Sequence, residues 1–126
     1  MARIDERPPV WIGHVFMTVT EVKQSAEFMR KLGMREIVQA EDISVLELRG
    51  GTHLLLRPTS GPIAPGTMAP FDLMVDDLEG SHKKFEALGL SPSTIQADTF
   101  HRSFTLFDPS GYAITVNSSH VSDSPV

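Results

Sequence analysis

The sequence predicts an α+β fold built from two tandem βαβββ modules, and three observations support this. Segments with strand-like alternation and segments with helical spacing of apolar residues follow one another in the order βαβββ, linker, βαβββ. Matching residues recur at a fixed distance: Val19 and Val75 lie 56 residues apart, as do KLGM at 31–34 and ALGL at 87–90. The segment FDPSGYAITV at 107–116 joins a tight turn to a strand, because proline fixes φ and glycine permits the left-handed conformation.

The 126 residues fit a single domain that is long enough for a sizeable core. The segment PTSGPIAPGTMA at 58–69 is rich in Pro, Gly, Ser and Thr, which is typical of a linker between two folded halves. We therefore expect one domain over 1–126 that divides into a first module at about 10–58, a linker at about 59–69, a second module at about 70–117 and a polar tail at 118–126.

The first module is expected to hold one helix and four strands. Val22, Ala26 and Met29 have the spacing of one helix face, and Gly33 can end that helix in the left-handed conformation. The glycine pair at 50–51 predicts a hairpin between two alternating segments. The predicted elements are a strand at 11–19, a helix at 21–32 and strands at 35–40, 44–49 and 52–57.

The second module repeats this order. Leu78 and Phe85 belong to the apolar side of its helix, and Gly89 ends that helix as in the first module. Asp108 and Gly111 are interpreted as turn formers before the last strand. The predicted elements are a strand at 70–76, a helix at 77–88 and strands at 94–98, 102–107 and 112–117.

Composition excludes several classes of function. The chain has no cysteine, which excludes disulfides and thiolate chemistry and leaves the redox compartment open. The net charge is −5, and residues 61–126 carry eight acidic but three basic side chains, so the sequence offers no basic patch for nucleic acid. No apolar segment approaches the ~20 residues of a membrane span. MARIDERPPV at the N-terminus lacks an apolar secretory core, so we expect a cytoplasmic protein that binds neither nucleic acid nor membrane.

The repeated element order and the FDPSGYAITV segment resemble the vicinal oxygen chelate family over residues 10–117. That family contains glyoxalase I, extradiol dioxygenases, fosfomycin-resistance enzymes and bleomycin-resistance proteins. The resemblance implies a curved mixed sheet with helices on its convex side and a concave cup that holds a small-molecule ligand. It also implies a homodimer, since paired modules in the family often pack edge to edge.

Strand alternation divides the side chains between the two faces of this sheet. The strongly apolar set is expected to face the helices: Val15, Met17, Leu46, Leu48, Leu54, Leu56, Leu73, Val75, Phe104, Leu106, Ile114 and Val116. The opposite set mixes polar and apolar groups, as a small-molecule pocket does, and is expected to face the cup. Its ligand-binding candidates are His14, Phe16, His53, Leu55, Arg57, Asp72, Met74, His101, Thr115 and Asn117.

Metal-dependent members of the family carry one ligand on each of four strands. The resemblance maps these positions onto His14, Leu55, Pro70 and Thr115. Leucine and proline cannot ligate an ion, and a neutral threonine hydroxyl is a poor ligand for a catalytic divalent ion, which needs about three protein donors. We therefore expect no metal or other cofactor.

A rearranged metal site is the alternative. A set of two histidines and one carboxylate suits a divalent metal, and several such side chains have the parity of the cup. This set would combine His14 with Glu47, His53 or Asp72. Nothing in their spacing selects one trio.

Each polar candidate also has a purely structural interpretation. His14 can be a ligand contact, a general base or a histidine satisfied inside the domain, and the sequence leaves these open. His53 and His101 can be simple surface or loop residues. Asp72 interrupts an apolar strand and must be paired or hydrated, so it can meet a cationic ligand, Arg57 or a dimer interface.

Three hypotheses about function follow. The first is a metal-free binding protein of the bleomycin-resistance type, which sequesters a small organic molecule in the cup. The second is a lyase or dioxygenase of the glyoxalase or extradiol kind with a non-standard metal set that includes His14. The third is a metal-independent isomerase or epimerase in which His14 acts as a general base.

Overall fold

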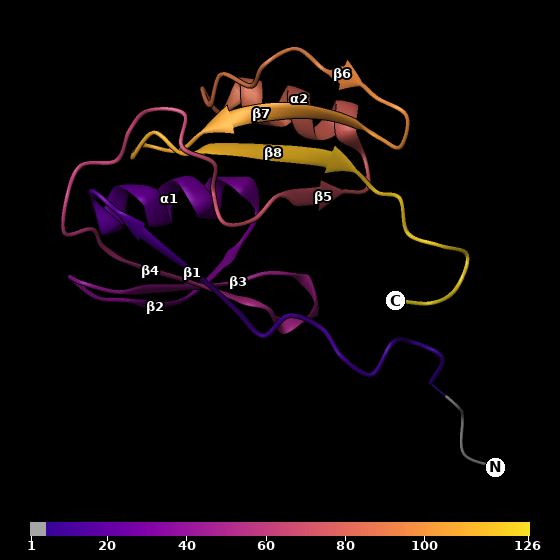
Figure 1. Cartoon of the computed structure of the whole chain (residues 1–126), viewed down its shortest axis with the longest axis horizontal. Helices are drawn as coiled ribbons and strands as arrows, with labels where there is room; N and C mark the ends of the chain where they lie inside the picture. Colours follow the sequence, from indigo (N-terminus) through magenta and orange to yellow (C-terminus); the bar gives the residue numbers. More distant parts are fainter. Residues whose placement is uncertain (1–4) are drawn as a thin grey trace.

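The computed structural model has eight strands, two helices and one short 3-10 turn, and it describes residues 5–126 (Figure 1). The elements of the first module are β1 (His14–Val19), α1 (Val22–Leu32), β2 (Arg35–Gln39), β3 (Ser44–Glu47), the 3-10 turn η1 (Arg49–Gly51) and β4 (His53–Pro58). Those of the second module are β5 (Leu73–Val75), α2 (Leu78–Ala87), β6 (Gln96–Ala97), β7 (Arg102–Phe107) and β8 (Ala113–Ser118). The predicted duplication of the βαβββ unit is thereby confirmed.

Each module forms its own four-stranded mixed sheet. The strand orders are β1-β4-β3-β2 and β5-β8-β7-β6, so corresponding strands occupy corresponding places in the two sheets. β1 pairs with β4 in parallel, β5 pairs with β8 in parallel, and the remaining neighbours are antiparallel. β1 and β5, the first strands of their modules, are therefore both edge strands.

Several elements are shorter than the sequence indicates. β1 begins at His14 and not at Trp11, and β5 begins at Leu73 and not at Pro70. A parallel bridge between Met68 and Ala113 lies ahead of β5, and Pro70, which has no amide hydrogen to donate, stands between this bridge and the strand. The glycine pair lies in a 3-10 turn between β3 and β4, where Gly50 has φ +84°.

The apolar faces of the strands pack on one continuous core. Of the twelve residues expected to face the helices, eight are buried, and Val15, Leu48, Leu73 and Val75 are half-buried against the same core. On the opposite faces the large apolar side chains of Phe16 and Met74 are 65% and 49% exposed. The prediction of which residues share a face is confirmed.

The core includes residues of both modules, and a buried polar cluster joins them. Asp108 is 4% exposed; it accepts hydrogen bonds from the Ser25 hydroxyl at 2.8 Å and from the backbone N–H groups of Ser110 and Tyr112. The Thr20 N–H donates to Ser110 Oγ at 2.9 Å. Asp108 is therefore a turn former, as expected, and it also fastens the β7–β8 turn to α1, which lies between the first sheet and the second module in Figure 1.

Helix ends follow the local chemistry of the sequence. Gly33 follows α1 with φ +117°, and its N–H donates to the Arg30 carbonyl. Asp77 precedes α2 and accepts a hydrogen bond from the Gly80 N–H at 3.0 Å, which satisfies one of the free donors of the first turn. Gly33 thus ends the first helix as the sequence predicts.

Candidate functional site

The predicted cup residues are divided between two hollows. The first-module hollow has a volume of about 320 Å³ and is lined by Phe16, Met17, Thr18, Leu55, Arg57, Met68, Pro70 and Tyr112. The second-module hollow has a volume of about 540 Å³ and is lined by Met68, Ala69, Pro70, Phe71, Asp72, Asp98, His101, Ser103, Thr115 and Asn117. Met68 and Pro70 belong to both, so the two hollows adjoin at the end of the linker.

Strand register builds the first-module hollow. Phe16 of β1 is the neighbour of Leu55 of β4, and Thr18 is the neighbour of Arg57 in the same parallel ladder. The Tyr112 hydroxyl donates to the Thr18 carbonyl at 2.7 Å, which brings the second module to this wall. The hollow thus has an apolar base with one cationic side chain.

Arg57 and Asp72 do not pair with each other. Both side chains are exposed, and within residues 5–126 neither takes part in an ion pair or a side-chain hydrogen bond. The alternative in which Arg57 neutralises Asp72 is therefore wrong. Arg57 lies at the first-module hollow and Asp72 at the second-module hollow, and each is free to meet a bound molecule.

Asn117 is the most confined polar group of the second-module hollow. It is neighbour to Ser103 of β7 and to Met74 of β5, and it is only 3% exposed. Its Oδ1 has no hydrogen-bond partner among the described residues. Leaving a buried acceptor unpaired costs about 1–3 kcal/mol, so a hydrogen-bond donor that reached Oδ1 from the hollow would remove this cost.

The turn between β6 and β7 supplies Asp98 and His101 to the same hollow. Asp98 Oδ1 accepts hydrogen bonds from the N–H groups of His101 at 2.9 Å and Phe100 at 2.8 Å, and these bonds hold the pKa of Asp98 below its ordinary value. His101 Nδ1 lies 3.1 Å from Asp98 Oδ2 but is not oriented for a hydrogen bond. Asp98 is therefore anionic at neutral pH.

A row of polar side chains crosses the open face of the first sheet. His14 stacks near Phe16 with ring centroids 6.1 Å apart and lies 6.0 Å from the ring of His53. His53 Nε2 is 2.9 Å from Glu47 Oε2, and Arg35 Nη1 is 3.2 Å from Glu47 Oε1. His14 is exposed, so the interpretation of His14 as a satisfied interior histidine is wrong.

The row lies outside the two hollows. His14, His53 and Met74 line neither the first-module nor the second-module hollow, whereas the other seven ligand-binding candidates line one or the other. His53 is half-buried and hydrogen-bonded, so it is more than a simple surface residue. The candidate set therefore separates into hollow-lining residues and a polar row.

The residues present do not fit the divalent ion of the family. The four mapped positions offer one imidazole, and the described residues contain no group of three or more His, Asp or Glu side chains arranged to hold a metal ion. Of the rearranged set, Asp72 lines the second-module hollow, which His14 does not. His14, His53 and Glu47 are neighbours on the first sheet, but within residues 5–126 they are not arranged to hold an ion. We derive no chemical step through a metal.

A third, smaller hollow of about 170 Å³ lies on the core side between the modules. Its walls are mainly apolar and include Val15 and Leu54, and Phe71 and Asp72 line it as well as the second-module hollow. An Arg49–Asp76 ion pair at 2.8 Å spans the modules nearby, since Arg49 also lines this hollow. It contains none of the histidines and belongs to the packing between the modules.

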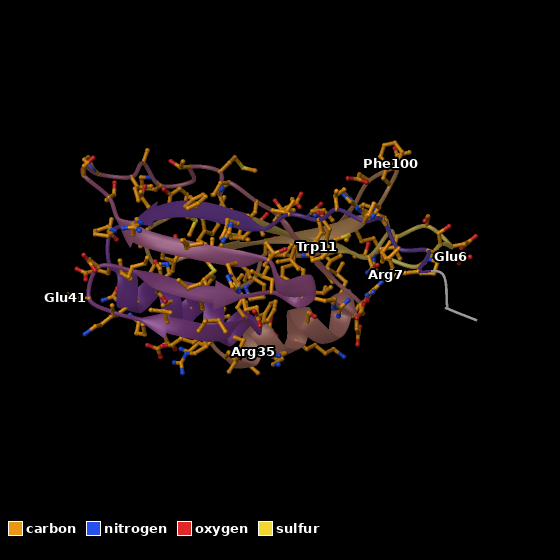
Figure 2. All side chains as sticks on the ribbon, turned by 90° about the horizontal axis from the view of Figure 1, so that it is seen from below. Glu6, Arg7, Trp11, Arg35, Glu41 and Phe100 are labelled. Carbon is orange, nitrogen blue, oxygen red and sulfur yellow. The ribbon has the colours of Figure 1, made fainter. Side chains whose placement is uncertain are left out.

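Sequence reasoning missed part of the lining. Met68 was assigned to the linker, Tyr112 to a strand face and Asp98 to a strand end, yet all three line a hollow. Trp11 is 70% exposed ahead of β1, and Phe100 is 84% exposed on the β6–β7 turn, where Figure 2 shows it projecting from the molecule. The exposed apolar Met68 at the end of a Pro- and Gly-rich linker was the available signal.

Two mixed βαβββ sheets with hollowed faces define a class of α+β proteins with paired modules. Residues 11–116 match the Glyoxalase/Bleomycin resistance protein/Dioxygenase superfamily. The chain belongs to this superfamily, as the resemblance predicts. No curated protein matches the chain.

Solved structures show the same fold at low sequence identity. Lactoylglutathione lyase from Agrobacterium tumefaciens has a TM-score of 0.73 at 18% identity and covers 90% of this chain and 97% of its own. TnmS3, an antibiotic binding protein from Streptomyces sp. CB03234, has a TM-score of 0.74 at 16% identity, with 86% and 95% covered. Oxidase ChaP-H1 has a TM-score of 0.70 at 19% identity, with 87% and 96% covered.

These likenesses establish the architecture, and their names include enzymes as well as a binding protein. Within residues 5–126, no helix has the length and apolarity needed to cross a bilayer.

Proposed function

We propose that this protein binds a small organic molecule in its hollows without a divalent metal, in the manner of a bleomycin-resistance-type binding protein. One observation carries the proposal. Three of the four mapped metal positions, Leu55, Pro70 and Thr115, line the hollows, and none of them supplies a strong ligand for a catalytic ion. The surface that relatives use for an ion is left for direct contact with a ligand.

The lining has the character of a small-molecule site. Phe16, Leu55 and Met68 give apolar contact area, and a few polar groups stand among them. Arg57 in one hollow and Asp72 in the other can orient a charged group, because neither is neutralised by a described neighbour. Sequestration would follow from shape and apolar contact, with the charges selecting among ligands.

A dimer in the cytoplasm completes the proposal. β1 and β5 are edge strands, and the large apolar side chains of Phe16, Met68 and Met74 are exposed on or beside the open faces. Pairing with a second copy would cover these surfaces and enclose the hollows. Analytical ultracentrifugation at micromolar concentration is expected to give a dimer mass; a monomer would remove this part of the proposal.

Native mass spectrometry of the purified protein tests the main claim. We expect less than about one metal ion per ten chains and a retained small molecule or none. Thermal stabilisation by organic ligands is expected to be the same with and without EDTA. Stoichiometric zinc, nickel, manganese or iron, together with loss of ligand response in EDTA, would contradict it.

A second candidate is metal-independent proton transfer, and the Glu47–His53 contact favours it. Glu47 can fix the orientation and tautomer of the His53 ring, as carboxylate partners do for general-base histidines. This contact supports His53 as the acid–base residue of the second candidate, whereas the sequence hypothesis names His14. Turnover of a carbon acid that falls at least about 100-fold in His53→Gln, but not in His14→Gln, would support this candidate.

A further inference from the structure

We propose that the second-module hollow binds the positively charged nitrogen group of its ligand, an ammonium or amidinium carried on a compact organic molecule. The inference rests on the proposed function, because it names the chemistry of the molecule held at one of the two hollows. It assigns Asn117 and Asp72 as the residues that receive the nitrogen group. Neither role follows from the fold alone.

Asn117 supplies the first argument. Its side chain lines the hollow and is 97% removed from solvent, yet Oδ1 accepts no hydrogen bond within residues 5–126. A carbonyl oxygen can only accept, so the group that satisfies it must donate an N–H or O–H. In the sheet, Asn117 of β8 lies between Ser103 of β7 and Met74 of β5.

Charge supplies the second argument. Asp72 and Asp98 line the hollow, and its described lining contains no lysine or arginine. Asp98 already uses one oxygen to fix its own turn, whereas Asp72 has no hydrogen-bond or ion-pair partner among the described side chains. A neutral hydroxyl could donate to Asn117 Oδ1, but it would gain little from the negative charges of Asp72 and Asp98. A cationic N–H donor satisfies both.

Shape and the neighbouring hollow supply the third argument. Met68, Pro70 and Phe71 form an apolar wall, so the ligand needs an apolar body beside its charged head. An aromatic ring such as Phe71 also favours a nearby cation. The adjoining first-module hollow carries Arg57 and repels the same group, which restricts the cation to the second-module hollow.

Titration by two-dimensional NMR of the intact chain tests the proposal with three probes of one shape. Benzamidine is cationic, benzyl alcohol is neutral and benzoate is anionic. At pH 7 and low salt, benzamidine is expected to shift the backbone amides of Ser103 and Thr115 and the side-chain amide of Asn117 in a saturable manner. Benzyl alcohol is expected to bind at least about fivefold more weakly, and benzoate to leave these signals unchanged.

Two variants separate the contacts. Asp72→Asn removes the exposed charge and is expected to weaken benzamidine binding about fivefold or more. Asp123→Asn makes the same chemical change in the exposed C-terminal tail and is expected to leave binding unchanged. Asn117→Val removes the orphaned acceptor and is expected to abolish the selective response, with a dispersed spectrum as the check on folding.

The inference is overturned if benzamidine and benzyl alcohol bind the hollow equally, if Asp72→Asn binds benzamidine as the unsubstituted chain does, or if no probe shifts these signals. Equal binding of the neutral probe would leave the proposed function standing, since a molecule still occupies the hollow. Failure of the proposed function has a different signature, which is stoichiometric metal with an EDTA-sensitive ligand response.

Discussion

In the first module the charged side chain that lines the hollow is Arg57, whereas Asp72 and Asp98 take that place in the second. The polar groups of the two sheets also differ in whether they have hydrogen-bond partners. Glu47 and His53 satisfy each other on the first sheet, while Asn117 on the second sheet has an unpaired oxygen.

The faces that pack on the core differ far less. Leu46 of β3 and Leu106 of β7 occupy corresponding strands, and both are completely buried. Both modules thus keep a buried leucine on this strand, where a smaller side chain would leave a cavity. We therefore expect functional residues on the sheet faces where the side chains of the two modules differ.

The largest expected effect tests whether the two modules share one core. Leu46→Ala and Leu106→Ala each remove a fully buried side chain from matching strands, and each is expected to destabilise the chain by about 2–5 kcal/mol. Because the core cluster is continuous across the modules, urea unfolding followed by circular dichroism is expected to show one transition in both variants. Two separated transitions, with only the altered module weakened, would show that the modules fold independently.

A smaller effect is expected at the contact between the modules. Asp108→Asn weakens the hydrogen bonds to Ser25, Ser110 and Tyr112, and a loss of about 1–3 kcal/mol in unfolding free energy follows from its burial. Asp98→Asn is the control, because that carboxylate organises an exposed turn within one module. Chemical denaturation of both variants measures the difference, and equal losses would contradict a special role for the buried turn.

The smallest effect concerns acid pH at the β6–β7 turn. Backbone N–H groups of His101 and Phe100 lower the pKa of Asp98 from its ordinary value of 3.8, so the folded state holds its proton less tightly than the unfolded state does. The stabilising contribution is therefore present above the unfolded pKa and is lost as pH falls through the lower, folded pKa.

NMR titration between pH 2 and 6 gives the test. The amide signals of Phe100 and His101 are expected to move with a midpoint below 3.8, and the movement is expected to vanish in Asp98→Asn. A midpoint for Asp98 at or above 3.8 would contradict the assignment.

Local pattern was enough to predict the elements and the two faces of each sheet. Alternation along β7 and β8 places Phe104, Leu106, Ile114 and Val116 in the core, because successive side chains of a strand point to opposite faces of the sheet. Strand ends were less predictable, since β5 starts three residues later than expected, at Leu73. An apolar segment can be extended without having a neighbour to pair with.

Contacts between distant segments could not be predicted from local pattern. Ser25 and Asp108 are 83 positions apart, and nothing in either neighbourhood announces that they meet in the core. The division of the expected cup into two hollows has the same origin, because it depends on where the linker places Met68 and Pro70. Composition alone identified the linker but not the part that its last residues play in both hollows.

Met68 and Pro70 are walls of both hollows. A ligand that moved the thioether of Met68 in the first-module hollow would change the free energy of filling the second, and by linkage the effect would be equal in both directions. Through the flexible side chain of Met68, binding in the two hollows would then be either cooperative or mutually exclusive.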